Sequence, residues 1–94
     1  MTTFIMRGKY SIDAVRLISG ERTMKGNQII QQCGGTMVGA YATLGDADIL
    51  VIAKFPGVDE AMKASIGLNK ALGISFATVP AIPVDDFDKL VGGK

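Results

Sequence analysis

The stretch Leu44-Gly45-Asp46-Ala47-Asp48-Ile49-Leu50-Val51-Ile52-Ala53-Lys54-Phe55 decides the fold of this 94-residue chain. A polar turn, 44–48, leads directly into a strand that is apolar at almost every position. A strand with one face in water alternates between apolar and polar residues, so this pattern predicts a strand covered on both faces. A chain of this length has little helix with which to cover a second face, and we therefore expect a second copy of the chain to cover it.

The segments on either side complete a βαββαβ order. Ser11 is expected to cap a first helix, which breaks at Ser19-Gly20, and Gly34-Gly35 ends its second part. The order predicts a single α+β domain over 1–94 with the ferredoxin-like fold, in which the helices lie on one face of a four-stranded antiparallel sheet. We expect strands at 3–10, 36–44, 48–55 and 74–79, helices at 11–33 and 59–72, and a short helical turn at 85–91.

The pairing of the two hairpin strands assigns residues to the faces of this sheet. Pairing Thr43 with Asp48 predicts three further pairs: Tyr41 with Leu50, Gly39 with Ile52, and Met37 with Lys54. The alternate residues of the first hairpin strand are then expected under the helices: Val38, Ala40, Ala42 and Leu44. The opposite, open face has an apolar floor, which we expect to form a sheet-to-sheet dimer interface through Ile5, Met37, Leu50 and Ile52.

Polar side chains gather at one end of the open face. The first and third strands are antiparallel, so Arg7 and Lys9 approach the end at which Asp48 lies. The candidate ligand-binding residues at this end are Arg7, Lys9, Tyr41, Thr43 and Asp48. Asp48 is open to two interpretations. It is a turn residue that caps the hairpin or pairs with a neighbouring cation, or it is a carboxylate that contacts a ligand's amine or hydroxyl between subunits.

The composition argues against several classes of function. A net charge of +1 gives no electrostatic reason to expect nucleic acid or a membrane as a partner. The chain has no His and a single Cys, so we expect no metal and no cofactor. A charge at Arg7 interrupts the N-terminus too early for a secretory signal, and no stretch has membrane-spanning length, so we expect a cytoplasmic protein.

Several short motifs together resemble the GYD-domain family. They are Thr3–Ser11, Ser19-Gly20-Glu21-Arg22, Gly34-Gly35, the turn Leu44–Asp48 and Pro80-Ala81-Ile82-Pro83. In the signature turn, Gly45 and Asp48 match and Ala47 stands where the family has Tyr. The resemblance implies a ferredoxin-like domain of the dimeric α/β-barrel type. The hairpin is also similar to that of the ligand-binding domain of leucine-responsive regulators, in which small effectors bind between subunits.

Two functions remain open from the sequence. The first is a homo-oligomeric domain that binds a small molecule at the sheet-face interface or serves a structural role. The alternative is a cofactor-independent oxygenase or isomerase of the dimeric α/β-barrel type. For such an enzyme the candidates for acid–base work are reduced to Arg7, Lys9, Tyr41 and Asp48.

Overall fold

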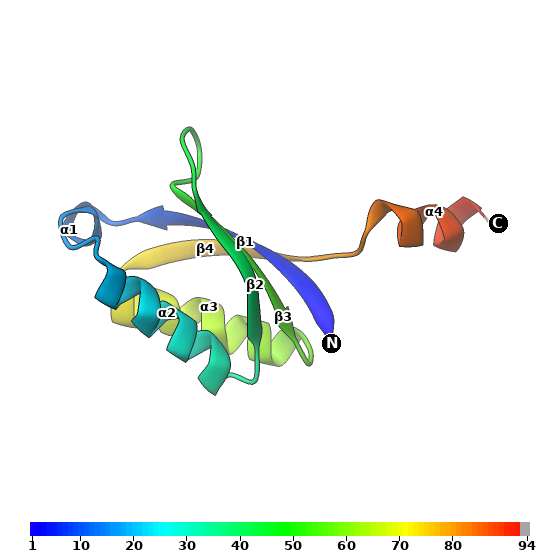
Figure 1. Cartoon of the computed structure of the whole chain (residues 1–94), viewed down its shortest axis with the longest axis horizontal. Coiled ribbons are helices and arrows are strands. Elements are labelled where there is room, and N and C mark those ends of the chain that lie inside the picture. Colours follow the sequence, from blue (N-terminus) through cyan, green and yellow to red (C-terminus); the bar gives the residue numbers. More distant parts are fainter. Residues whose placement is uncertain (93–94) are drawn as a thin grey trace.

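The computed structural model describes residues 1–92 and has the predicted βαββαβ order (Figure 1). In chain order the elements are β1 (Thr2–Tyr10), α1 (Ile12–Val15), α2 (Gly20–Gln32), β2 (Thr36–Ala42), β3 (Ile49–Phe55), α3 (Val58–Leu72), β4 (Ile74–Ala81) and α4 (Val84–Gly92). The four strands form one antiparallel sheet in the order β2-β3-β1-β4. This confirms the α+β, ferredoxin-like prediction, with β3 and β1 in the centre.

Serine side chains begin the first two helices. The hydroxyl of Ser11 accepts from the N–H of Ala14, and the hydroxyl of Ser19 accepts from the N–H of Arg22. Each satisfies a backbone donor that has no partner inside its helix. The predicted break at Ser19-Gly20 is therefore the start of α2. The helix expected to continue to that break ends earlier, at Val15, and leaves Leu17 exposed.

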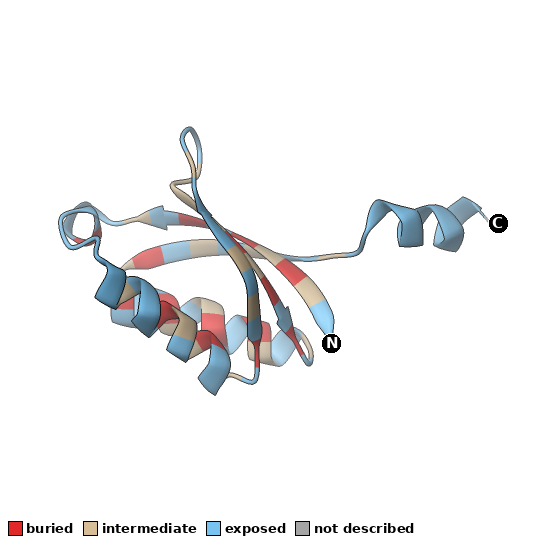
Figure 2. Ribbon diagram, viewed as in Figure 1, coloured by how far each residue is buried: buried red, intermediate tan, exposed pale blue. Residues whose placement is uncertain are grey.

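Helices α2 and α3 cover one face of the sheet and enclose the core between the two layers (Figure 2). The side chains of β3 that face the helices are buried, as is the predicted apolar stripe of α3: Val51, Ala53 and Phe55 on the strand, and Ala61, Ala64, Leu68 and Leu72 on the helix. The ring of Phe55 meets that of Phe4 edge to face, with centroids 5.8 Å apart. Three of the four strands have residues in this core cluster: β1, β3 and β4.

The edges of the sheet differ from the prediction at two places. Strand β2 ends at Ala42, so Leu44 lies in the hairpin loop, fully exposed, and is not under the helices. Strand β4 continues beyond Val79 through Pro80 to Ala81. Proline is tolerated there because β4 is an edge strand, where a missing N–H leaves no neighbour without a donor.

A bulge in β2 moves Met37 to the other face of the sheet. Tyr41 pairs with Leu50 and Gly39 with Ile52, as predicted, but the register then shifts and Met37 pairs with Ala53 instead of Lys54. One extra residue reverses the direction of every side chain beyond it. Met37 therefore packs against the core, and its assignment to the open-face interface was wrong. Val38, expected under the helices, is exposed at the bulge.

Helix α4 extends away from the two-layer body (Figure 1). None of its described residues is buried, and the apolar side chains Val84, Phe87, Leu90 and Val91 are at least half exposed. No helix within residues 1–92 has both the length and the apolar character needed to cross a membrane.

A pair of glycine substitutions tests the packing of the core. A Cβ added to Gly35 would lie 2.6 Å from Cδ1 of Phe55, whereas one added to Gly20 would meet nothing within 4 Å. We expect Gly35→Ala to lower the free energy of unfolding by about 1–3 kcal/mol, because Phe55 has to move. The matched Gly20→Ala should leave it unchanged or raise it by up to about 1 kcal/mol. Urea unfolding measures both, and equal effects would contradict this packing.

Candidate functional site

The side chains of the open face form rows across the four strands. The registers place Gly39, Ile52, Ile5 and Val79 in one row, and Tyr41, Leu50, Arg7 and Ala77 in the next. Of the predicted interface residues, Ile5, Leu50 and Ile52 thus lie together on this face and form its centre. Val79 on β4, which the sequence reasoning did not assign, extends the apolar row and is 51% exposed. We call Ile5, Leu50, Ile52 and Val79 the apolar floor.

Asp48 ends the pairing between β1 and β3. Its N–H donates to the carbonyl of Gly8 over 2.8 Å, and its carboxylate oxygen Oδ2 accepts from the N–H of Tyr10 over 3.0 Å. The carboxylate replaces the carbonyl that a longer strand would offer to Tyr10. Asp48 therefore has the capping role, through a backbone donor and not through the predicted cations.

Thr43 closes the hairpin on its other side. Its N–H donates to the carbonyl of Asp48 over 2.9 Å, which is the predicted pairing, and its hydroxyl donates to the carbonyl of Ala47 over 2.7 Å. The hydroxyl proton of Thr43 is thus used to hold the loop.

Tyr41 points away from this polar end. A Cβ on Gly39 would lie 3.4 Å from ring atom Cε2 of Tyr41 and 3.6 Å from its hydroxyl oxygen. The ring therefore lies along β2 over Gly39, towards the row of Ile52, and is 60% exposed. The structure does not bring the Tyr41 hydroxyl to the carboxylate of Asp48.

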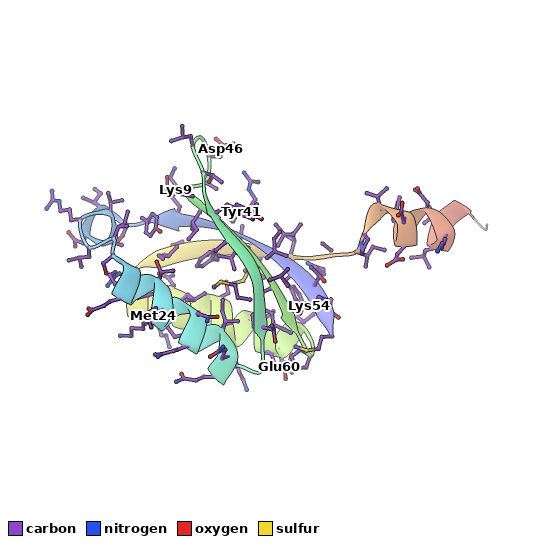
Figure 3. The ribbon with its side chains drawn as sticks, viewed as in Figure 1. Lys9, Met24, Tyr41, Asp46, Lys54 and Glu60 are labelled. Carbon is purple, nitrogen blue, oxygen red and sulfur yellow. The ribbon has the colours of Figure 1, made fainter. Side chains whose placement is uncertain are left out.

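Arg7 and Lys9 lie on the other side of the hairpin, next to β4. The ammonium of Lys9 is 3.4 Å from the carbonyl of Asp46, and both residues are labelled in Figure 3. Arg7 and Lys9 line a shallow depression with the loop residues Asp46 and Ala47 and with Ser75, Phe76 and Ala77 of β4. The five predicted ligand-binding residues thus share one end of the sheet but not one depression. In residues 1–92 no three Cys, Asp or Glu side chains come together as a metal site requires.

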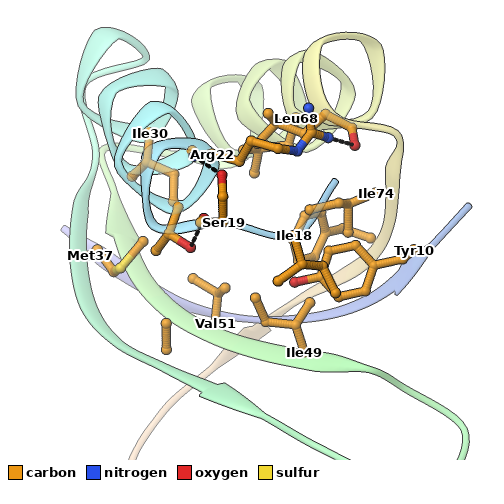
Figure 4. Close-up of a pocket in the computed structure, with 15 residues that line it drawn as sticks. Tyr10, Ile18, Ser19, Arg22, Ile30, Met37, Ile49, Val51, Leu68 and Ile74 are labelled. Carbon is orange, nitrogen blue, oxygen red and sulfur yellow. Dashed lines mark hydrogen bonds between the residues drawn. The ribbon is translucent and has the colours of Figure 1, made fainter. Parts of the chain in front are cut away.

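The structure contains a second hollow, which the sequence reasoning missed. It lies between α2 and the helix-facing side of the sheet and has a volume of about 60 Å³ (Figure 4). We call it the core cavity. Its walls are apolar side chains of both layers, including Ile30, Met37, Val51, Leu68 and Ile74, and polar side chains line it at the start of α2 and the end of β1: Ser19, Arg22, Thr23 and Tyr10.

The inward face of α2 explains why this space is left open. Arg22, Gly26 and Ile30 follow one another at helical spacing, and only Ile30 places a large apolar side chain in the core. Gly26 has no side chain, and the guanidinium of Arg22 donates through Nη2 to the carbonyl of Leu72 at the end of α3. A glycine and an arginine on the buried stripe of a helix are the signal that sequence reasoning had available for this cavity.

Comparison with known proteins identifies a family and nothing finer. Searches of curated proteins and of solved structures return no match to this chain. The model of the GYD domain matches residues 4–91, which include α2, α3 and the four strands apart from the first two residues of β1. The chain belongs to the GYD-domain family.

Proposed function

We propose that this chain is a cytoplasmic, homo-oligomeric domain whose copies pack through the open faces of their sheets and bind a small molecule beside that interface. The observation that supports this is the apolar floor, which lies on a face that α2 and α3 leave uncovered. Apolar side chains in the middle of an exposed sheet favour burial against a complementary surface, and a second copy offers the same surface.

The size of the open face suits a small dimer interface. Four strands spaced about 4.8 Å apart and about 25 Å long present on the order of 500 Å² in each copy. Two such faces together bury on the order of 1,000 Å², which is the lower bound for a specific interface. Further apolar area beyond the sheet would therefore strengthen the dimer considerably.

Helix α4 offers that further area. Its apolar residues Val84, Phe87 and Leu90 recur at spacings of three and form one stripe. Asp85, Asp86 and Asp88 make the helix acidic, whereas the open face carries the cations Arg7, Lys9 and Lys54. We propose that α4 of one copy packs against the open-face side of the other, so that both apolar surfaces and both charge patterns are matched.

The ligand site of this proposal is the polar end of the interface. Arg7 and Lys9 offer positive charge, and Asp48 offers a carboxylate that is already oriented by the N–H of Tyr10. A small molecule with groups of both signs, such as an amino acid, matches this set. Thr43 would flank it from β2, where its hydroxyl can accept but has used its proton, whereas the Tyr41 ring lies further along the strand over Gly39.

The geometry favours binding over the enzyme alternative at this end. General acid–base catalysis requires a group whose protonation is tuned by burial or by a close partner. Arg7 and Lys9 are exposed, the Tyr41 hydroxyl lies over Gly39, and Asp48 is engaged by a backbone donor. These residues are arranged to hold charges in place and not to exchange a proton with one another.

Ile52→Lys tests the sheet-face dimer. Ile52 lies at the centre of the apolar floor, and burying an unpaired ammonium there is expected to weaken association at least a hundredfold, about 2.7 kcal/mol. Light scattering after size exclusion at micromolar concentration should give twice the chain mass of 9.9 kDa for the parent and the single mass for the variant. Met62→Lys, on the exposed side of α3, is the control and should remain dimeric. A monomeric parent would contradict the proposal.

Removing the apolar stripe of α4 tests its part in the dimer. We expect the double change Phe87→Ala with Leu90→Ala to weaken association about tenfold or more, because two large side chains lose their burial. Thermal unfolding of the monomeric Ile52→Lys background should not change on adding these substitutions, since α4 has no buried residue. An unchanged dimerisation constant, measured by sedimentation, would assign α4 no role in the interface.

A thermal-shift screen of amino acids, organic acids and aromatic metabolites tests ligand binding at the polar end. A ligand of this site should raise the melting temperature of the parent and act less on Arg7→Gln and Asp48→Asn. Asn keeps an oxygen that accepts from the N–H of Tyr10, so Asp48→Asn removes the charge and preserves the cap. Lys63→Gln on α3 is the charge-matched control. Equal stabilisation of all variants would contradict binding at the polar end. Stabilisation by no compound would contradict ligand binding and support a purely structural role.

A further inference from the structure

The core cavity lies on the other side of the sheet from the proposed dimer interface and within a single chain. The helix-facing side chains of β3 form its base, and Leu68 and Leu72 of α3 close it at the back. The mouth lies between the start of α2 and the edge strand β2, where Ser19, Thr23 and Ala40 are exposed. A molecule can therefore enter the cavity without any separation of the two layers.

The donors that the cavity offers to a ligand come from Tyr10 and Arg22, since the hydroxyl of Thr23 already donates to the carbonyl of Ser19. Figure 4 shows the side chain of Tyr10 with its hydroxyl directed into the cavity. Arg22 uses Nη2 for the carbonyl of Leu72, and a guanidinium has five N–H donors in all. Ser19 caps α2, a helix of 13 residues whose N-terminal end carries a partial positive charge.

The charge of the cavity lining indicates that the polar group of a ligand should be an anion. The residues that line the cavity include Arg22 and no Asp or Glu. The planar N–H groups of the positively charged guanidinium match the two oxygens of a carboxylate. Hydroxyl donation by Tyr10 adds a further bond to the same kind of acceptor.

Size limits the apolar part of the ligand. The volume of about 60 Å³ is several times the roughly 10–15 Å³ that one water molecule needs. It is smaller than the roughly 150 Å³ of an engineered cavity that holds benzene. Met37 in the wall has a flexible side chain, and Ile18 at the mouth is 59% exposed, so both can move aside for a single ring.

We propose that the core cavity binds a small carboxylate with a short branched or single-ring apolar body. The apolar body packs against Ile30, Val51 and Leu68, and the carboxylate accepts from Arg22 and from the Tyr10 hydroxyl. This site is separate from the polar end of the sheet interface and does not depend on association of two copies.

Calorimetric titration with sodium isovalerate and sodium benzoate tests the proposal, with isovaleramide and benzamide as neutral counterparts. The parent should bind at least one carboxylate and bind it about tenfold or more tightly than its amide. Arg22→Gln should remove that preference, while Arg16→Gln, an exposed arginine outside the cavity, should retain it. Binding of neither carboxylate by the parent, or equal binding of acid and amide, would overturn the proposal.

Three variants separate cavity binding from loss of structure and from the dimer. Ala40→Phe should block the mouth and weaken binding at least tenfold without touching Arg22, whose bond to Leu72 also supports α3. Tyr10→Phe should weaken binding severalfold and retain the parent circular dichroism spectrum. The monomeric Ile52→Lys variant should bind like the parent, because the cavity belongs to one chain. Binding that survives Ala40→Phe would place the ligand elsewhere and contradict the assignment.

Discussion

Strand β3 is apolar on both of its faces, and the arrangement of the rest of the molecule depends on this property. Val51, Ala53 and Phe55 are buried under the helices, while Leu50 and Ile52 face the opposite side. A strand of this kind belongs in the centre of a sheet, and the order β2-β3-β1-β4 places it there. The two crossovers of a ferredoxin-like fold lie on the same side, so its helices cover only one face. The second face of β3 is the part of its surface that the core of the chain leaves open.

Periodicity was sufficient to predict the elements and their order, because burial in this fold repeats with the strand and helix periods. Periodicity failed where a bulge adds a residue to a strand and where a strand ends. Met37 and Val38 are both apolar, so their polarity contains no sign of the bulge that exchanges their faces. Leu44 followed the alternation of β2 beyond the point at which pairing stops. The predicted end of the last strand at Val79 is wrong because the strand continues through Pro80, and a proline is tolerated there only since β4 is an edge strand, which is a property of the whole sheet.

The candidate sites were predictable only as far as they follow from strand pairing. Antiparallel pairing alone placed Arg7, Lys9 and Asp48 at one end of the sheet. The partner of Asp48 was not predictable, because the free N–H of Tyr10 exists only where the β1–β3 ladder ends. The core cavity depends on the distance between the helices and the sheet, which no local sequence pattern determines. Its only trace in the sequence is a buried stripe of α2 that contains Arg22 and Gly26 where a covering helix usually has larger apolar residues.

The bulge in β2 affects both faces of the sheet. It removes Met37 from the open face and adds it to the wall of the core cavity. On the open face β2 is left with Thr36, Gly39 and the ring of Tyr41 that lies over Gly39, so this strand contributes little aliphatic surface there. The apolar floor is therefore centred on β3 and β1 and continues to Val79 on β4. The strand on which the floor ends, β4, is also the strand that leads into α4. In the proposed dimer, an interface displaced towards β4 would bring the α4 helices to its rim, where their apolar stripe would add area that a four-stranded face alone barely supplies.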